Sequence, residues 1–248
     1  MTAVTNIQQA NEIPEVLLTS TQKAACQKIW QTAHYFFKYG RSVTTTPFRG
    51  FILEGEPATG KTEIVRQAAR KLSSLMGDES RVTLYFVDTA SIAAPRWGEA
   101  ETALKNAFDS DGSERRVVLF DDIDCLMMKR GFDVAREWHY SINAAMFHRL
   151  DNIDPRQLII TATTNRPDLI DDALRSRLYS LEVPVPRKDE LLEIAKVVLR
   201  GSGLDGPAAA KVLTKVEHDL QKQGKPTIRD IQHTITLECI EGGFWSTI

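Results

Sequence analysis

The sequence predicts an α/β fold: a parallel five-stranded sheet flanked by helices, followed by a small all-α domain. Short apolar segments alternate with segments of helical periodicity between residues 50 and 186, which is the pattern of strands joined by helical crossovers. Three helical segments then follow one another. We therefore expect a flexible leader over residues 1–18, a large α/β domain over residues 19–186 and a small helical lid domain over residues 187–248.

The first helix is expected within residues 19–40, where apolar side chains recur at helical spacing. Ser20 or Thr21 is expected to cap its beginning, and Gly40 to end it. Strands are expected at residues 50–55, 81–88, 115–122, 157–165 and 179–185. Further helices are expected at residues 61–77, 97–108, 137–151 and 171–177 of the large domain, and at residues 188–201, 206–224 and 227–240 of the small one.

The composition is that of an ordinary globular protein, with 42% hydrophobic and 26% charged residues. The net charge of −2 gives no support to electrostatic binding of nucleic acid. The three cysteines form no CxxC pair, so we expect neither a disulfide framework nor a zinc site, and a cytoplasmic location fits. The sequence contains no signal-peptide pattern and no apolar run of membrane-spanning length, so no membrane association is expected.

The stretch "GEPATGKT", residues 55–62, matches the phosphate-binding pattern GxxxxGK[ST] between a predicted strand and a predicted helix. Its glycines allow the loop to turn backbone N–H groups toward an anion, and the helix N-terminus adds positive potential. We expect Lys61 to reach the outer phosphates of a nucleotide and the Thr62 hydroxyl to join a Mg²⁺ shell. The other expected nucleotide-binding residues of this stretch are Gly55, Pro57, Ala58, Thr59, Gly60 and Glu63.

The stretch "VVLFDDID", residues 117–124, reads as a buried strand that ends in acids. A carboxylate at the end of a neighbouring strand is suitably placed to hold the metal beside a phosphate loop, which predicts that Asp121 binds Mg²⁺. Asp122 would then polarise the attacking water. The alternative is that both acids only cap the following helix. Such strands usually end in Asp-Glu, so either a working ATPase with a shortened carboxylate or a slowly hydrolysing switch fits the pair.

These two stretches and "TATTNRPDLIDDALRSRL", residues 161–178, resemble the AAA+ ATPase superfamily, and the match runs from about residue 50 to residue 235. The third stretch is similar to the second region of homology of the classical AAA clade, which is more specific than the phosphate loop alone. The resemblance implies that Asn165 is the sensor 1 residue that orients the hydrolytic water. An amide suits this role because it can donate and accept hydrogen bonds at once, although a turn-forming role before "RPD" is the alternative.

The resemblance also implies an arginine finger, which one subunit inserts into the nucleotide site of its neighbour. Arg177 is the preferred candidate and Arg175 the second, because the short "SR" form is similar to clamp loaders and helicase loaders rather than to the classical clade. A surface ion pair is the alternative for both. Arg229, in "GKPTIRDIQ", is similar to the sensor 2 position and would reach the phosphates from the lid, with a solvated surface position as its alternative.

Residues 91–101, "SIAAPRWGEAE", are similar to the first pore loop of the superfamily. Arg96 stands where the aromatic residue normally lies, and Trp97 takes the next position. Trp97 could grip an extended polypeptide or pack into the sheet edge, and Arg96 could contact a phosphate backbone.

The resemblance implies a Mg²⁺-dependent ATP hydrolase that assembles as a homo-oligomeric, hexamer-type ring and remodels a protein partner supplied by another chain. Two other functions remain open. One is a nucleic-acid-associated loader or regulator, which the Asp-Asp pair and the "SR" form favour and the charge does not. The other is a slow ATP-dependent interaction switch. Stimulation of hydrolysis by DNA would distinguish the loader from the remodeller.

Overall fold

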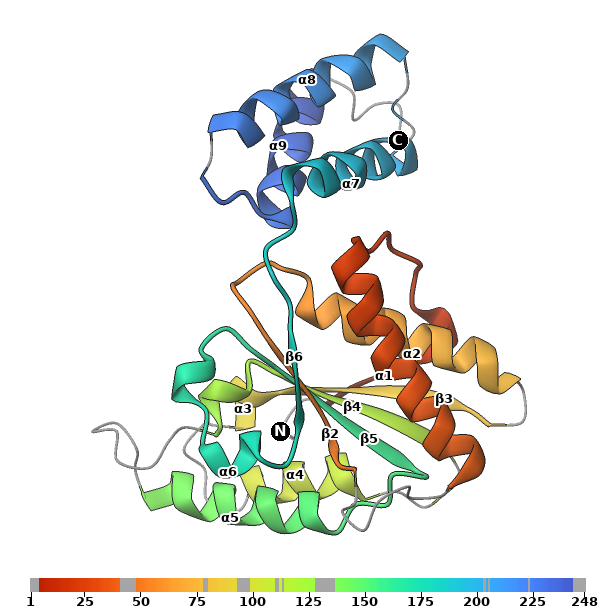
Figure 1. Cartoon of the computed structure of the whole chain (residues 1–248), viewed down its shortest axis with the longest axis vertical. Helices are drawn as coiled ribbons and strands as arrows, with labels where there is room; N and C mark the ends of the chain where they lie inside the picture. Colours follow the sequence, from red (N-terminus) through yellow and green to blue (C-terminus); the bar gives the residue numbers. More distant parts are fainter. Residues whose placement is uncertain are drawn as a thin grey trace.

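The computed structural model describes residues 5–40, 48–77, 80–92, 99–109, 112, 114–127, 137–202, 204, 206–222 and 224–242. Six strands form one sheet in the order β1-β3-β4-β5-β2-β6 (Figure 1). Their bounds are β1 Thr5–Gln9, β2 Gly50–Glu54, β3 Val82–Asp88, β4 Arg115–Asp121, β5 Leu158–Thr164 and β6 Tyr179–Glu182. The strands β3, β4, β5, β2 and β6 are parallel, as the sequence predicts.

The sixth strand corrects the sequence prediction for the leader. Residues 1–18 were expected to be flexible, yet β1 pairs antiparallel with β3, with Thr5 opposite Val87 and Gln9 opposite Thr83. Its sequence "TNIQQ" carries no apolar run, and the Ile7 side chain is 54% exposed. The strand is therefore attached to the sheet edge mainly by backbone hydrogen bonds, which a search for apolar periodicity does not detect.

The helices of the large domain cover both faces of the sheet (Figure 1). They are α1 Ser20–Tyr39, α2 Lys61–Met76, α3 Thr89–Ile92, α4 Glu99–Phe108, α5 Glu137–Asp151 and α6 Asp172–Arg175. Phe51 and Leu53 of β2 pack with α1 and α2 on one face, whereas Ile52 between them packs with α4 and α5 on the other. This alternation buries β2 on both faces, so the segment that leads into the phosphate loop is firmly held.

The cap of α1 lies one residue before the predicted positions. Thr19, rather than Ser20 or Thr21, closes a capping box with Gln22: its Oγ1 accepts from the Gln22 backbone N–H at 3.2 Å, and Gln22 Oε1 accepts from the Thr19 N–H at 2.9 Å. The reciprocal pair satisfies two N–H groups at the beginning of the helix. It also turns the Gln22 side chain inward, where only 2% of the residue is exposed.

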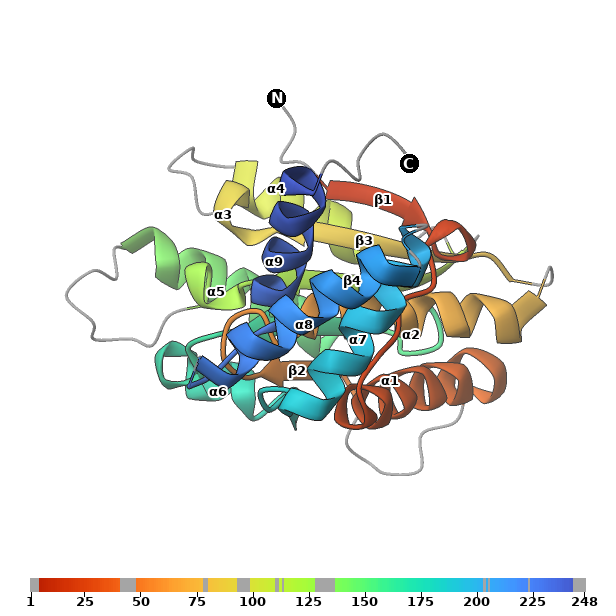
Figure 2. The same cartoon turned by 90° about the horizontal axis from the view of Figure 1, so that it is seen from above.

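The helices α7 Lys188–Gly201, α8 Gly206–Lys222 and α9 Ile228–Glu241 form a separate small bundle. They enclose a core of their own, which includes Leu191, Val212 and Ile231. Viewed from above, the bundle lies over the sheet of the large domain (Figure 2). In the part of the chain that the structure describes, no helix combines the length and the apolar character that crossing a membrane would require.

Candidate functional site

The loop between β2 and α2 has the backbone form expected of a phosphate cradle. Gly60, directly before α2, has φ +85°, a left-handed conformation that glycine adopts without strain. A Cβ on Gly60 would lie 2.6 Å from Nε2 of Gln22, so a side chain at this position would collide with α1. The same Nε2 donates to the Thr59 carbonyl at 2.7 Å. The first turn of α1 therefore packs against the loop and helps to hold its conformation.

Lys61 is buried at the beginning of α2, and its amine is held from three directions. Nζ donates to the carbonyl oxygens of Gly55 and Glu56 at 3.0 and 2.8 Å, and to Oδ1 of Asn165 at 2.6 Å. Burial lowers the pKa of the Lys61 amine, while the charges of Asp122 and Asp121 oppose that shift. Among the described residues that line the neighbouring cavity, Lys61 is the buried cation, and its amine lies over the loop.

Asp121, at the carboxyl end of β4, is held together with the hydroxyl groups of Thr62 and Thr163. Both hydroxyls donate to Asp121 Oδ1 at 2.7 Å. Thr62 and Asp121, which the sequence predicts as metal ligands, are therefore in direct contact. Asp124 lies apart from this pair and accepts a hydrogen bond from Thr164 Oγ1 at 2.7 Å.

Asp122 follows with a left-handed backbone, φ +50° and ψ +55°. Its Oδ1 accepts from Asn165 Nδ2 at 2.9 Å, so Asn165 contacts both Asp122 and Lys61. The Asp122 carboxyl group remains open to solvent, but the surrounding protein removes part of its hydration. That loss of hydration, together with the charges of Asp121 and Asp124, raises its pKa.

These residues line a cavity of about 500 Å³ between the two domains. Its polar end holds Lys61, Thr62, Asp121, Asp122 and Asn165. The phosphate loop and its surroundings add Gln22, Pro57, Ala58, Gly60, Glu63 and Thr163. The leader and the lid supply Val16, Leu17, Leu18, Ile194, Val198, Ile228, Arg229 and Gln232. One end is therefore charged and the other mostly apolar, which suits a ligand that combines phosphates with a flat ring system.

The apolar wall is the part of the site that sequence reasoning missed. Residues 16–18 were assigned to a flexible leader, yet they line the cavity. Gln67 of α2 holds the leader in place by donating from Nε2 to the Pro14 carbonyl at 2.7 Å. The available signal was the apolar run "VLL" within a polar segment, directly before a helix.

Comparison with known proteins assigns this fold and this loop to a family. The family model for the "ATPase family associated with various cellular activities (AAA)" matches residues 51–185, more than half of the chain. The chain belongs to the AAA ATPase family.

Two relatives and one solved structure illustrate the family. The chain is 32% identical over 160 residues to the "ATPase family gene 2 protein" of Schizosaccharomyces pombe, which covers 62% of this chain and 19% of that protein. It is 36% identical over 132 residues to the "ATPase histone chaperone YTA7" of Saccharomyces cerevisiae, which covers 52% of this chain and 9% of that protein. The matched region is thus a fifth or less of either relative. A chain of the E. coli MS115-1 HORMA:CdnC:Trip13 complex shares the fold, with a TM-score of 0.70 and 18% identity over 92% of this chain and 84% of that one.

Three arginines of this AAA domain were expected near a nucleotide, and the structure separates them. Arg229 of α9 lines the cavity from the lid and is exposed. Arg175 and Arg177 are not among the described residues that line it. Arg175 Nη2 donates to Glu54 Oε2 at 3.2 Å, and its side chain is 41% exposed.

Arg177 is held more firmly than Arg175. Its Nε and Nη2 each donate to the Asp151 carboxylate at 3.0 Å, and its Nη1 donates to the Ala173 carbonyl at 2.9 Å. Its guanidinium also lies over the Phe147 ring, 4.8 Å from the centroid. The Asp151 carboxylate raises the pKa of Arg177 further, so this side chain is a fixed cation.

Arg96 and Trp97, the predicted pore-loop residues of the AAA domain, lie outside the residues that the structure describes. Their role stays a prediction from the sequence.

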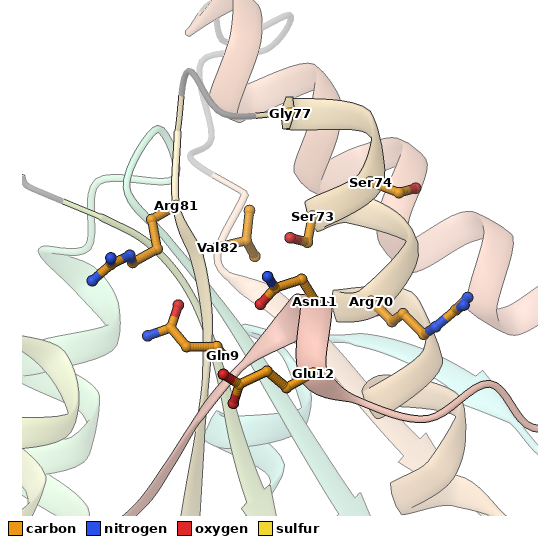
Figure 3. Close-up of a pocket in the computed structure, with 9 residues that line it drawn as sticks. All are labelled: Gln9, Asn11, Glu12, Arg70, Ser73, Ser74, Gly77, Arg81 and Val82. Atoms are coloured by element: carbon orange, nitrogen blue, oxygen red, sulfur yellow. The ribbon is translucent and has the colours of Figure 1, made fainter.

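A second hollow, of about 640 Å³, lies beside β1 at the far end of α2 (Figure 3). It is lined by Gln9, Asn11, Glu12, Arg70, Ser73, Ser74, Gly77, Arg81 and Val82. Because α2 has 16 residues, Gly77 lies about 24 Å from the phosphate loop. Arg70 is already paired with Glu15 at 3.0 Å, and the polar groups of this hollow do not converge on a common point (Figure 3). The cavity at Lys61, where the polar side chains meet, is therefore the candidate functional site, although the second hollow is larger.

Proposed function

We propose that this AAA domain binds ATP with Mg²⁺ and hydrolyses it within a ring of identical subunits that remodels a protein partner. The observation that carries the proposal is the pair of hydrogen bonds made by Asn165. This one amide contacts the buried amine of Lys61 at 2.6 Å and the carboxylate of Asp122 at 2.9 Å. The side chains that we propose as the phosphate-binding cation, the water-polarising acid and the sensor amide are therefore in contact with one another.

The cavity fits ATP in size and in chemical character. Its volume of about 500 Å³ is within the range of small-molecule sites, roughly 300–1,000 Å³. The phosphates would lie on the N-terminus of α2, and the base would lie against the apolar wall formed by the leader and the lid. Thr62 Oγ1 and Asp121 Oδ1, in contact at 2.7 Å, are the hard oxygen donors that Mg²⁺ prefers. Mg²⁺ bound there would neutralise charge on the phosphate oxygens.

Hydrolysis would then depend mainly on positioning and charge. Lys61 would exchange its contacts with Gly55, Glu56 and Asn165 for the outer phosphates. Asp122 would accept a hydrogen bond from the attacking water, and Asn165 would hold both the water and the γ-phosphate. Fixed groups that stabilise developing charge account for most of the catalysis in sites of this kind.

The ring is proposed because the arginines of residues 172–177 lie outside their own cavity. An arginine from a neighbouring subunit would complete the site. A protein partner is supported by two names among the comparisons. One relative is called a histone chaperone, and the solved structure that shares the fold belongs to a complex named for HORMA, CdnC and Trip13.

The test measures phosphate release from ATP and Mg²⁺ over a range of protein concentrations, together with the oligomeric state by light scattering. We expect specific activity to rise as oligomers form, and Lys61→Ala to abolish ATP binding. Lys71→Ala changes an exposed lysine of the same helix and is the matched control. It should retain both ATP binding and ATP hydrolysis.

Specific activity that stays flat through oligomer formation would contradict completion of the site by a neighbour. Turnover that DNA stimulates, and that falls steeply with salt, would favour a nucleic-acid loader instead of a protein remodeller. ATP binding without turnover at any concentration would favour an interaction switch.

A further inference from the structure

The backbone of Asp122 has a conformation that most residues avoid. Its φ of +50° makes it one of two described non-glycine residues with positive φ, the other being Ala58 in the phosphate loop. Aspartate tolerates this conformation better than most residues, but it needs support from its surroundings. The aspartate side chain is one methylene shorter than that of glutamate. The direction of its Cα–Cβ bond therefore decides which groups the carboxylate can reach.

Two buried threonine hydroxyls hold this residue at its two ends. Thr163 Oγ1 accepts from the Asp122 backbone N–H at 3.0 Å, while it donates to Asp121 Oδ1 at 2.7 Å. Thr89 Oγ1 lies 2.5 Å from the Asp121 carbonyl and 2.9 Å from the Asp122 carbonyl. Both threonines are 1% exposed, and β-branched side chains have few rotamers, so their hydroxyls are well fixed.

The Thr163 hydroxyl therefore links the two acids through one atom. It uses its single proton on the carboxylate of Asp121 and a lone pair on the backbone of Asp122. Loss of this hydroxyl would release the left-handed turn that directs Asp122 toward Asn165, whereas Asp121 Oδ1 would keep the hydrogen bond from the Thr62 hydroxyl. This effect does not require Thr163 itself to touch ATP.

We propose that Thr163, assisted by Thr89, is a positioning residue that fixes the left-handed backbone of Asp122 and so places the short carboxylate where hydrolysis requires it. The inference rests on the proposed function, because it assigns a role within the same site. It explains how an Asp-Asp pair can serve where a longer second acid is usual.

The same strand offers a matched control. Thr161 lies two residues before Thr163, on the same face of β5, and is completely buried. Its Oγ1 donates to the Val118 carbonyl at 2.8 Å, within β4 and away from both acids. Thr161→Val therefore removes a comparable buried hydroxyl and leaves the acid pair untouched.

The experiment compares Thr163→Val, Thr163→Ser and Thr161→Val with the unmodified chain. It measures kcat for ATP hydrolysis and the Kd of a fluorescent ATP analogue. We expect Thr163→Val to lower kcat by roughly 10²-fold, the cost of a misplacement of about 1 Å, and to change the Kd by less than about threefold. Thr163→Ser should retain most of the kcat because it keeps the hydroxyl, and Thr161→Val should remain near the unmodified value.

A double-mutant cycle distinguishes positioning from general loosening of the structure. If Thr163 acts through Asp122, Thr163→Val should not reduce the residual rate of an Asp122→Asn chain any further. Additive losses in the cycle would overturn the proposal. A Thr163→Val kcat within twofold of the unmodified chain, or an equal loss in Thr161→Val, would also overturn it.

A substitute variant and the behaviour of the unmodified chain distinguish failure of this inference from failure of the proposed function. If Thr163→Val does not fold, as judged by thermal unfolding, Thr89→Val replaces it with the same expected loss of kcat and the same criteria. An unmodified chain that binds but never hydrolyses ATP would contradict the proposed function and this inference together. An active chain that is insensitive to both threonine changes would contradict this inference alone.

Discussion

Asn165 donates a hydrogen bond from Nδ2 to Oδ1 of Asp122 over 2.9 Å. The contact shows that an aspartate at this position is long enough to reach the neighbouring strand end. Asp122 stands where a glutamate is usual in the superfamily that the sequence resembles, which raised the question whether the site is shortened beyond use. The structure instead joins the short carboxylate to the amide that also holds Lys61.

This contact leads to a prediction for Asp122→Glu. The additional methylene would move the carboxylate by about 1.5 Å, past the position at which Asn165 now meets it. We expect kcat to fall at least about 10-fold, because the backbone and its threonine supports are arranged for the shorter acid. The control is Asp122→Asn, which should retain ATP binding and keep only a small residual turnover. A rate for Asp122→Glu equal to or above that of the unmodified chain would show that the site is limited by the short acid.

The phosphate-loop half of the site was predictable because its chemistry is local in the sequence. Residues 55–62 contain the whole phosphate-binding pattern, including the first residues of the helix that follows the loop. Asp121 stands at the end of an apolar strand. Parallel strand order then brings Asn165 beside the acids, since β5 lies between β4 and β2. The same local logic predicted the alternation of strands and helices, and therefore the α/β fold.

Other parts depend on contacts that the sequence does not reveal. The strand β1 is polar and belongs to the sheet only because the edge of β3 accepts it. Leu17 and Leu18 line the cavity because Gln67 holds the chain before them. Thr163 is one of several threonines in β5, and only the three-dimensional arrangement distinguishes it from Thr161.

The second prediction concerns the arginine that would act on a neighbouring subunit. The sequence ranks Arg177 first, but three hydrogen bonds and the Phe147 ring hold that side chain within its own subunit. Among the described residues, the Arg175 side chain donates one hydrogen bond, to Glu54, and it is more exposed than that of Arg177. We therefore expect Arg175→Ala to lower turnover by roughly 10³-fold, as loss of an arginine finger does. Arg177→Ala should mainly reduce stability, by about 1 kcal/mol.

Mixing two inactive variants tests whether Arg175 acts between subunits. Arg175→Ala subunits retain their own Lys61, and Lys61→Ala subunits retain their own arginine. A mixture should therefore regain activity that neither variant shows alone. Glu54→Gln is the control for loss of the ion pair, and should keep turnover because the arginine remains. No recovery in a mixed oligomer, together with strong loss in Arg177→Ala, would assign the finger to Arg177.

The third prediction concerns the joint between the two domains. Glu190, in the first turn of α7, accepts at Oε1 from Ser20 Oγ at 2.5 Å and from the Ser20 N–H at 3.1 Å. Ser20 begins α1, whose Gln22 supports the phosphate loop, so one short segment contacts both the lid and the loop. Ser20→Ala removes the hydroxyl contact and leaves Glu190 able to cap α7 through the Arg187 N–H.

We expect Ser20→Ala to weaken ATP binding about fivefold, because the lid supplies part of the cavity wall and the lost hydrogen bond contributes about 1 kcal/mol. Titration with a fluorescent ATP analogue measures the change. Ser74→Ala is the matched control, since its hydroxyl donates to the Lys71 carbonyl within α2 at 2.7 Å. Equal affinities for the unmodified chain and Ser20→Ala would show that this contact does not position the lid.

The fourth prediction concerns Glu114, which joins two strands at the end of the sheet opposite the phosphate loop. Its carboxylate accepts from Thr83 Oγ1 at 2.6 Å, Tyr85 OH at 2.7 Å and Arg116 Nε at 2.7 Å. Burial alone would raise the pKa of Glu114. The hydrogen bonds from Thr83, Tyr85 and Arg116 outweigh burial and hold the pKa below its ordinary value of 4.5.

A carboxyl group whose pKa is lowered by folding stabilises the protein above its unfolded-state pKa, and that stabilisation is lost as the pH falls through the lower, folded-state pKa. We therefore expect Glu114→Gln to reduce the free energy of unfolding at pH 7 by about 1–3 kcal/mol, because buried donors lose a charged acceptor. The difference between Glu114→Gln and the unmodified chain should shrink as the pH falls below 4.5. Urea unfolding at several pH values measures it, with the exposed Glu193→Gln as a control that should change little. A difference that stays constant from pH 7 down to about pH 3 would show that the stabilisation does not depend on the Glu114 charge.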